Sequence, residues 1–394
     1  MCMTPFKSVQ VTYTAPNRAH HYAYARALAE AGCLRAFVCG FSRFSPRAAL
    51  PEVTGKLIRA DHLQNIYLAC LKLRMPAPVI DELAYWSKRW LDRRSETPAR
   101  QSNVFLFYSG AGLRTATRLQ GSGVARVVEA VNSHVLVQER ILREEYGRIG
   151  LPFRRFHPRE VARRVREYET ADAILCPSDF VRQTFEDEGI PAARIFTVPY
   201  GMSLPTAPPP IELSNDTFRV LYVGQISVRK GLRYLFEAFT QLRHPKKELW
   251  IVGPMTRQTG IHNIAVPAGT RFLGVLKGDA LAQAYQSSTV FVLPTVEDGL
   301  GLVLGEAMSF GLPLIATAHS GGANLFRDGE EGFIVPIRAS GVIAQRLQQL
   351  ADDPSLLSRM SAAAAARAKR LGGWETAGKM LVDAMSVISQ IPQR

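Results

Sequence analysis

The sequence predicts an α/β protein with two doubly wound domains that face each other across a cleft. Short apolar strands alternate with amphipathic helices in two successive series, which is the rhythm of doubly wound structure. A length of 394 residues is too great for one ordinary core, because domains cluster near ~100–200 residues. The segment 205–210 reads PTAPPP, and so proline-rich a stretch is stiff and cannot join a sheet, which makes it a linker.

The first series assigns residues 1–204 to one domain. It opens with a strand at 8–15, a helix at 20–31 and a second strand at 34–41. Further strands are expected near 103–107, 124–131, 173–176 and 195–200, where short apolar runs recur.

The second series follows a linker at 205–217 and occupies residues 218–373. Its strands are expected at 218–223, 248–252, 289–293 and 313–317. A helix at 231–242 carries five apolar side chains on one face: Leu232, Leu235, Phe236, Phe239 and Leu242. An alanine-rich helix at 361–370 is broken by Gly372 and Gly373. The last helix, within 374–394, has an apolar face that needs a partner surface, and we expect it to pack back on the first domain.

Composition excludes several classes of protein. Apolar residues make up 47% of the chain and charged residues 21%, the mix of a folded protein rather than a disordered one. No apolar run approaches the ~18–20 residues of a membrane span, and the start resembles no export signal. The five cysteines form no C-x-x-C pair, so we expect reduced thiols in a cytoplasmic chain.

The charge is positive and uneven. The formal net charge is +14, and residues 1–210 hold 29 Lys and Arg against 19 Asp and Glu. Such an excess suggests a partner with phosphates, which could be nucleic acid, an anionic lipid surface or a charged substrate. Nucleic-acid binding is disfavoured, because no helix-turn-helix, zinc-finger or RNP-like pattern accompanies the charge.

The most informative segment runs from 289 to 322. A buried strand ends at Pro294, a turn with Asp298 and two nearby glycines follows, and a helix from about 302 to 310 contains Glu306. A turn that feeds a helix directs free backbone N–H groups outward, where they favour an anion. Asp298 and Glu306 would be ~12 Å apart in a helix, too far for two carboxylates acting on one bond at ~5–9.5 Å. The spacing suits two acceptors on different hydroxyl-bearing parts of one long ligand; the alternative is a structural turn with solvated acids.

The segment Asp298-Gly-Leu-Gly-x(4)-Glu306-Ala-Met resembles the E-x(7)-E motif of retaining GT-B glycosyltransferases, in particular glycosyltransferase family 4. Residues 223–231, VGQISVRKG, are similar to the family's G-R-x(4)-K-G segment. The resemblance is dense from 232 to 354 and patchy in the first half. Asp298 stands where the family has Glu, Gln225 where it has Arg, and Leu300 where it has an aromatic residue.

The resemblance implies a GT-B fold of two Rossmann-like domains and retaining transfer of a sugar from a nucleoside-diphosphate sugar to a saccharide acceptor. It implies that Glu306 accepts from the ribose hydroxyls and that Lys230, with adjacent Arg229, holds the diphosphate. It assigns the donor sugar to Asp298 and the glycine turn. The complete expected donor site comprises Gly224, Gln225, Lys230, Val275, Leu276, Asp298, Gly299, Leu300, Gly301 and Glu306, and the expected catalytic groups are Lys230, Arg229, Asp298 and His134.

The first half supplies acceptor-side candidates. By the resemblance, His134 reaches the donor sugar, although an ordinary loop-capping histidine is the alternative. Arg18, His20, His21 and Ser133 are candidates for contact with the acceptor or a phosphate. No histidine spacing suggests a metal site, so we expect neither a metal nor a cofactor. The diphosphate would be stabilised by cations and backbone N–H groups, with front-face transfer, since no nucleophile for double displacement is evident.

Aromatic and cationic side chains alternate in one further segment. Val79, Leu83, Trp86 and Trp90 keep helical spacing among Lys and Arg, which suits a membrane interface. The alternative is a helix packed inward with solvated arginines. A second basic stretch, 140–166, holds nine Arg against three Glu. Peripheral docking on the inner, anionic leaflet would give access to a lipid-linked saccharide acceptor. Rival functions are another enzyme of this architecture, such as a sugar phosphorylase or an epimerase, and a catalytically inactive binding subunit.

Overall fold

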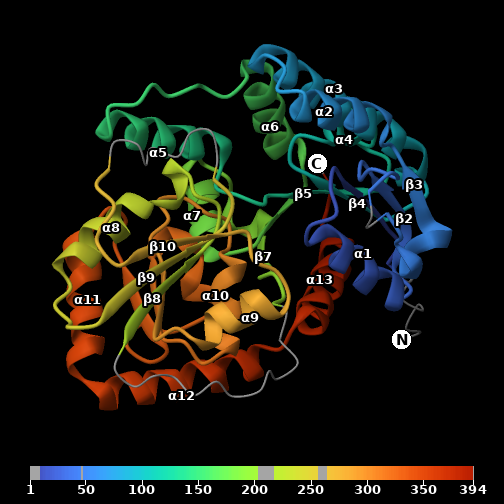
Figure 1. Cartoon of the computed structure of the whole chain (residues 1–394). Helices are drawn as coiled ribbons and strands as arrows, with labels where there is room; N and C mark the ends of the chain where they lie inside the picture. Colours follow the sequence, from blue (N-terminus) through green and yellow to red (C-terminus); the bar gives the residue numbers. More distant parts are fainter. Residues whose placement is uncertain (1–8, 46–47, 203–216, 256–263, 394) are drawn as a thin grey trace, which may run out of the picture.

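The computed structural model describes residues 9–45, 48–202, 217–255 and 264–393. It has two α/β domains side by side, each built on one parallel sheet (Figure 1). The predicted fold of two doubly wound domains is therefore confirmed. Nearly all of the proposed linker, from 205 to 216, lies outside the described residues.

The first sheet has seven parallel strands in the order β3-β2-β1-β4-β5-β6-β7. Their bounds are β1 Val11–Ala15, β2 Leu34–Cys39, β3 Leu57–Arg59, β4 Val104–Tyr108, β5 Ala125–Glu129, β6 Ala173–Cys176 and β7 Ile195–Thr197. Its helices are α1 His21–Glu30, α2 His62–Lys72, α3 Ala77–Ala99, α4 Leu113–Arg118, α5 Val135–Arg148, α6 Pro158–Thr170 and α7 Asp179–Asp187. The sequence missed β3, because three half-buried residues at a sheet edge leave no periodic signal.

The second sheet has six parallel strands in the order β10-β9-β8-β11-β12-β13. Their bounds are β8 Phe218–Val223, β9 Lys247–Val252, β10 Thr270–Gly274, β11 Val290–Leu293, β12 Leu314–Thr317 and β13 Gly332–Val335. Its helices are α8 Leu232–Gln241, α9 Asp279–Gln286, α10 Leu302–Ser309, α11 Ser340–Asp352 and α12 Pro354–Leu371. The sequence missed β10 as well, an edge strand whose side chains are largely exposed. The inner strands β11 and β12 are fully buried, as expected when helices cover both faces of a sheet.

The last helix returns to the first domain, as predicted. α13 (Trp374–Ile388) lies beside α1 at the end of α12, which runs along the bottom of the second domain in Figure 1. The two helices approach so closely that a Cβ on Gly378 would lie 2.5 Å from the Cβ of Ala27. Leu381, Met385 and Ile388 are buried on the same side of α13. α12 starts earlier than expected, because Asp353 caps it by accepting from the Leu356 N–H at 2.9 Å.

A helix of the first domain also fastens to the second. Glu145 of α5 accepts hydrogen bonds from the Tyr234 hydroxyl and from Nε of Arg338, both at 2.7 Å. Glu145 is almost fully buried, so these charged and polar bonds fix the two domains in one arrangement. Within the described part of the chain, no helix is long and apolar enough to cross a membrane.

Candidate active site

The predicted donor residues gather at the carboxyl ends of the strands of the second sheet. β8 leads through Gly224 and Gln225 to a short 3₁₀ turn, Val228–Lys230. β11 leads into the acidic turn before α10, and β10 leads to Val275 and Leu276. Ligands of doubly wound sheets bind at this edge, beside the point where the strand order reverses, which is between β8 and β11 here.

Two cations converge on Asp298. Lys230 Nζ bonds one carboxylate oxygen, and Arg229 Nη1 lies 3.3 Å from the other. Burial alone would raise the pKa of Asp298, but Lys230 and Arg229 outweigh it and hold that pKa below its usual value. The Asp298 carboxylate is therefore ionised. Another anion in its place could pair with the same two cations.

The cationic turn is held rigidly against the exit of β11. Gly231 adopts a left-handed conformation (φ 67°), and a Cβ there would lie 2.0 Å from the carbonyl oxygen of Pro294. The Val296 N–H donates to the Arg229 carbonyl at 2.9 Å, and the Thr295 hydroxyl does so at 3.1 Å. Only glycine allows this approach, which fixes Lys230 relative to the acidic turn.

Glu306 has a different partner from Asp298. Its Oε2 accepts from the Tyr285 hydroxyl at 2.9 Å, and the Tyr285 ring stacks on Phe310 with centroids 5.1 Å apart. Burial raises the pKa of Glu306, while the bond from Tyr285 opposes the rise. Asp298 and Glu306 therefore have separate partners, their roles as two acceptors stay a prediction, and no motif signalled Tyr285 as the partner of Glu306.

Glu297, next to Asp298, joins the two domains. This fully buried carboxylate accepts from Ser133 Oγ at 2.8 Å, from the Ser133 N–H at 3.2 Å and from Gln138 Nε2 at 3.0 Å. Arg229 Nη1 lies 3.4 Å from its other side. Ser133, expected on the acceptor side, is therefore an interdomain donor in this structure, and Glu297 is a residue that sequence reasoning missed.

The glycine turn touches the first domain directly. A Cβ on Gly299 would lie 1.9 Å from the carbonyl oxygen of Val131. The Ser178 hydroxyl donates to the Gly299 carbonyl at 2.6 Å. Leu300 and Gly301 are buried behind this contact, so the turn is shaped by the domain interface as well as by its own strand.

His134 packs in the core of the first domain. Its ring lies 4.8 Å from Tyr168 and 5.1 Å from Phe185, and burial lowers its pKa to about 4. It precedes α5 but its side chain does not cap that helix, so the capping alternative is wrong. A role at the donor sugar stays a prediction, one that requires the ring to turn out of this packing.

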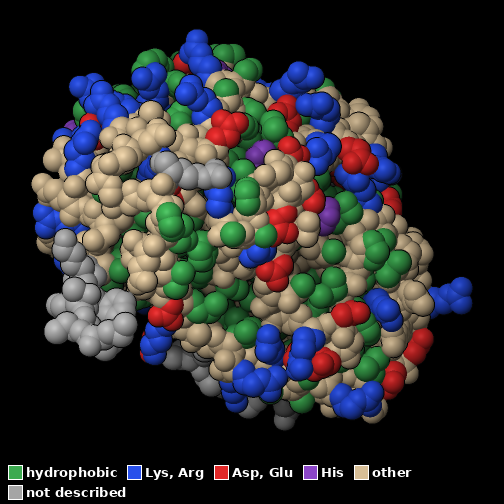
Figure 2. All heavy atoms as spheres, turned by 180° about the vertical axis from the view of Figure 1, so that it is seen from behind, with side chains coloured by type: hydrophobic (Ala, Val, Ile, Leu, Met, Phe, Trp, Pro, Cys, Tyr) green, Lys and Arg blue, Asp and Glu red, His purple; other side chains and the backbone are tan. Residues whose placement is uncertain are grey.

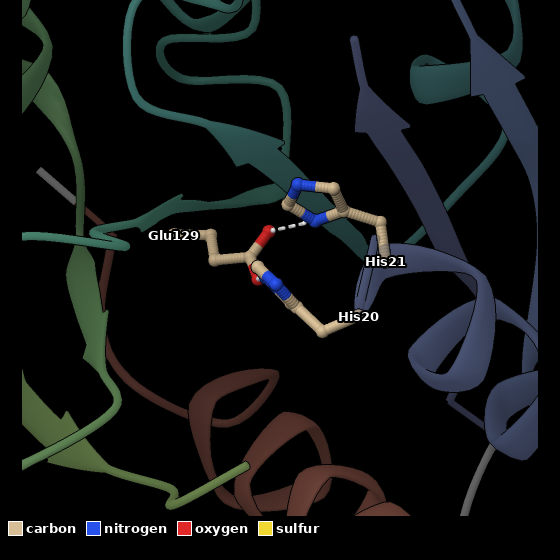
Figure 3. Close-up of side chains that lie close together, drawn as sticks. All are labelled: His20, His21 and Glu129. Atoms are coloured by element: carbon tan, nitrogen blue, oxygen red, sulfur yellow. Dashed lines mark hydrogen bonds and ion pairs between the residues drawn. The ribbon is translucent and has the colours of Figure 1, made fainter. Parts of the chain in front are cut away.

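His20 and His21 meet Glu129 at the end of β5 (Figure 3). His20 Nε2 lies 2.8 Å from one carboxylate oxygen and His21 Nδ1 lies 3.1 Å from the other. The Tyr13 hydroxyl donates to the same carboxylate at 2.7 Å and bonds His21 Nδ1 at 2.6 Å. Burial would raise the pKa of Glu129, but the two histidines hold it far below its usual range.

These atoms lie within 4.8 Å of one another, a spacing that could also hold a metal ion. The sequence could not reveal this cluster, because Glu129 comes from a distant strand. Arg18, the fourth acceptor-side candidate, lies over the Tyr22 ring with Cζ 4.6 Å from the centroid.

A cavity of about 860 Å³ opens between the domains. Its walls are α3, α5, the segment 153–157 and the start of α6 from the first domain, with Gln225, Ser227 and Arg229 from the second. The cavity therefore extends from the first domain to Arg229 of the second, an arrangement that would suit a site for two substrates.

Exposed apolar side chains project from α2, from α3 and from the connection between them. Seven of them are 37–74% exposed: Ile66, Leu68, Leu71, Leu73, Met75, Val79 and Trp86. Figure 2 shows hydrophobic side chains among many Lys and Arg along the upper edge of the molecule, where Figure 1 places these helices. Val79 and Trp86 are therefore exposed, whereas Trp90 of the same series packs inward against a buried cluster that includes Leu91. Arginines of the stretch 140–166 are instead extensively paired with acids, for example Arg154 with Asp81 and Arg159 with Glu82.

The second domain is similar in sequence to known glycosyltransferases. Residues 217–353 match the family described as "Glycosyl transferases group 1". The D-inositol 3-phosphate glycosyltransferase of Streptomyces griseus is 32% identical over 186 residues, which are 43% of this chain and 39% of that protein. The chain spans less than half the length of this relative and of the other D-inositol 3-phosphate glycosyltransferases that it matches.

Solved structures extend the likeness to the whole chain at the level of fold. Sucrose-phosphate synthase from Thermosynechococcus elongatus superposes with a TM-score of 0.70 at 17% identity, over 95% of this chain and 98% of that one. Anabaena HepE in complex with UDP and glucose gives a TM-score of 0.64 at 14% identity, over 96% and 100%. The predicted GT-B arrangement of two Rossmann-like domains is thereby confirmed.

Proposed function

We propose that this chain, whose second domain is a glycosyl transferases group 1 domain, transfers a sugar from a nucleoside-diphosphate sugar to a saccharide acceptor. The observation that carries the proposal is the convergence of Lys230 and Arg229 on Asp298 at the carboxyl edge of the second sheet. Further support comes from the bound UDP and glucose in the similarly folded HepE structure. The refined proposal is a retaining enzyme of the family 4 type.

In the proposed step, the bond between the anomeric carbon and the β-phosphate oxygen breaks on the same face on which the acceptor oxygen bonds to that carbon. The acceptor hydroxyl's proton passes to the departing phosphate oxygen. Lys230 and Arg229 leave Asp298 for the diphosphate and offset its growing charge, so we propose that no metal ion is required. Asp298 is then free to accept from hydroxyls of the donor sugar.

Glu306 has the complementary task of binding the nucleoside. Its carboxylate, positioned by Tyr285, accepts from the ribose hydroxyls, and Val275 and Leu276 line the place of the base. Gly224 and Gln225 follow β8 beside the diphosphate. Because the two acids have separate partners, each can bind its part of the donor without competing with the other.

The test is turnover of UDP-glucose by Lys230→Ala, measured as UDP release with and without acceptors. Loss of one charge-stabilising donor lowers kcat by roughly 10²–10³-fold. The matched control is Arg233→Gln, because Arg233 lies one turn further along and pairs with Glu237 within α8. Full activity in EDTA is expected. Unchanged turnover of Lys230→Ala would refute the proposal, and UDP binding without any turnover would favour the inactive binding subunit.

We further propose that the acceptor is lipid-linked, and that the exposed apolar face of α2 and α3 docks on the cytoplasmic, anionic leaflet. The guanidinium of Arg89 lies over the Trp86 ring at 5.0 Å, a pairing of aromatic body and cation suited to lipid headgroups.

Sedimentation with anionic vesicles at low salt tests this docking. Leu73→Ser should reduce it, whereas Val387→Ser, at an exposed apolar position on α13, should not. Failure of the wild-type chain to sediment would remove the membrane proposal and leave the catalytic one intact.

A further inference from the structure

The cavity between the domains is strongly cationic. Of the charged side chains that line it, five carry positive and two carry negative charge: Lys88, Arg154, Arg155, Arg164 and Arg229 against Asp81 and Glu160. Asp81 pairs with Arg154. The remaining acid, Glu160, therefore faces a surplus of cations, and the surplus concentrates where α3 meets α6.

A single carboxylate there serves three cations. Glu160 accepts from Lys88 Nζ and from Arg164 Nε at 3.2 Å through one oxygen, and from Arg163 Nη2 through the other. All four side chains are at least four-fifths buried. Burial, with Arg164 adding to it, lowers the pKa of Lys88 to about 8. Glu167 and Asp92 also interact with Arg163, and burial raises the pKa of both carboxyls, that of Glu167 to about 7. Buried cations with few fully ionised counter-ions are costly, and a further anion would offset that cost.

Unused hydrogen-bond donors accompany this surplus of charge. Arg163 is only 6% exposed, and its Nε and Nη1 atoms are buried with no hydrogen-bond partner among the residues that the structure describes. Its guanidinium lies 4.6 Å over the ring of Tyr85, which lines the cavity. Buried guanidinium donors are normally satisfied, so these two N–H groups are available to an additional acceptor.

The cluster lies at the carboxyl edge of the first sheet, where ligands of such sheets bind. Gly110, just after β4, has φ 94°, and a Cβ there would lie 2.5 Å from Glu160 and 3.4 Å from Lys88 Nζ. The Tyr108 ring has Lys88 Nζ 5.9 Å from its centroid on one side and the His21 ring at 5.6 Å on another. The cationic cluster is thus continuous with the His20–His21–Glu129 cluster.

We propose that Lys88 and Arg164, which line the cavity, form with the adjoining Arg163 a subsite for a phosphate monoester on the acceptor. The inference rests on the proposed function and names the chemistry of its second substrate. The negative charge and the three oxygens of a phosphate monoester suit several cationic donors at once. The phosphate displaces Glu160, and the rest of the acceptor extends through the aromatic-lined cavity toward Arg229.

Titration calorimetry of the full chain with inorganic phosphate, at constant ionic strength, tests the subsite. Arg164→Gln should weaken binding about tenfold or more, since it removes a charge-assisted contact. Glu160→Gln should strengthen binding, because it removes the competing carboxylate. The control is Arg159→Gln on the same helix, because the Arg159 side chain is 63% exposed and pairs with Glu82. This variant should bind phosphate with the affinity of the wild-type protein.

The expected changes in phosphate affinity are opposite for Arg164→Gln and Glu160→Gln, and a general loss of structure would not produce opposite changes. UDP is titrated in parallel, and its affinity should be unchanged in both. UDP binding without phosphate binding, or phosphate binding indifferent to Arg164→Gln and Glu160→Gln, overturns the subsite but not the glycosyltransferase. Failure of wild-type UDP binding instead counts against the proposed function.

Competition experiments distinguish the two sources of a phosphate monoester. Glucose 6-phosphate represents a soluble acceptor, and a polyprenyl phosphate in micelles represents a lipid-linked one. Displacement of inorganic phosphate by either supports the subsite and identifies the source. If neither competes, the subsite does not bind phosphate monoesters and the inference fails.

Discussion

Replacing Ser133 by alanine should loosen the contact between the two domains by a measurable amount. The Ser133 hydroxyl donates to Glu297 at 2.8 Å, and both side chains are buried. A hydrogen bond to a charged group contributes about 1.5–3 kcal/mol. Three other donors remain on Glu297 in the variant, so the carboxylate is not left unpaired and we expect a loss near the lower end, about 1.5 kcal/mol.

A double-mutant cycle isolates this bond. Ser133→Ala, Glu297→Gln and the double variant are unfolded in urea, and the free energies of unfolding are compared. We expect a coupling energy of about 1 kcal/mol or more, because contacting residues couple by ~0.5–3 kcal/mol. Ser288→Ala is the matched control, since its hydroxyl is buried but donates to Ala284 within the second domain. Additivity of Ser133→Ala and Glu297→Gln within about 0.3 kcal/mol would refute the reasoning.

Three further predictions concern other parts of the molecule. Tyr285→Phe removes a bond that favours ionised Glu306, so the pKa of Glu306 should rise further above its usual value and the acid limb of the kcat/KM profile should move to higher pH. Because burial lowers the pKa of His134 to about 4, the unfolded state takes up its proton first as pH falls from about 6.5 toward 4. The free energy of unfolding should therefore fall as pH falls over this window. His134→Leu should reduce the dependence of that free energy on pH by about 1.4 kcal/mol per pH unit, measured by urea unfolding at several pH values. Gly378→Val places side-chain atoms where Ala27 lies, so it should cost about 1–3 kcal/mol and expose α13 to limited proteolysis; unchanged digestion would contradict the packing.

Elements whose signal is local could be predicted from the sequence. β6, β8 and α13 have the expected bounds or nearly so, because apolar runs or a Gly372-Gly373 break mark them. The turns after β8 and β11 were also placed from the sequence, since their glycines and charged residues are adjacent in the chain. β10 escaped because an exposed edge strand has no buried face to impose a pattern.

Partners brought together only by tertiary contact could not be predicted. Tyr285 meets Glu306 across two helices, and Glu129 meets His20 and His21 from another strand. Lys88 is flanked by aromatic residues along its own helix, whereas in the folded chain it faces Glu160 on α6. The sequence shows which titratable side chains the chain has. The fold decides which side chain each of them contacts, and that contact sets its pKa and its charge.

The return of α13 onto α1 has a consequence for biosynthesis. As the chain emerges from the ribosome, α1 appears early, but the helix that covers it follows the whole of the second domain. The first domain can form its sheet during translation, yet the surface around Ala27 stays uncovered until Gly378 and Leu381 have emerged. A nascent chain stalled before that point should be a preferred client of chaperones that recognise apolar surface.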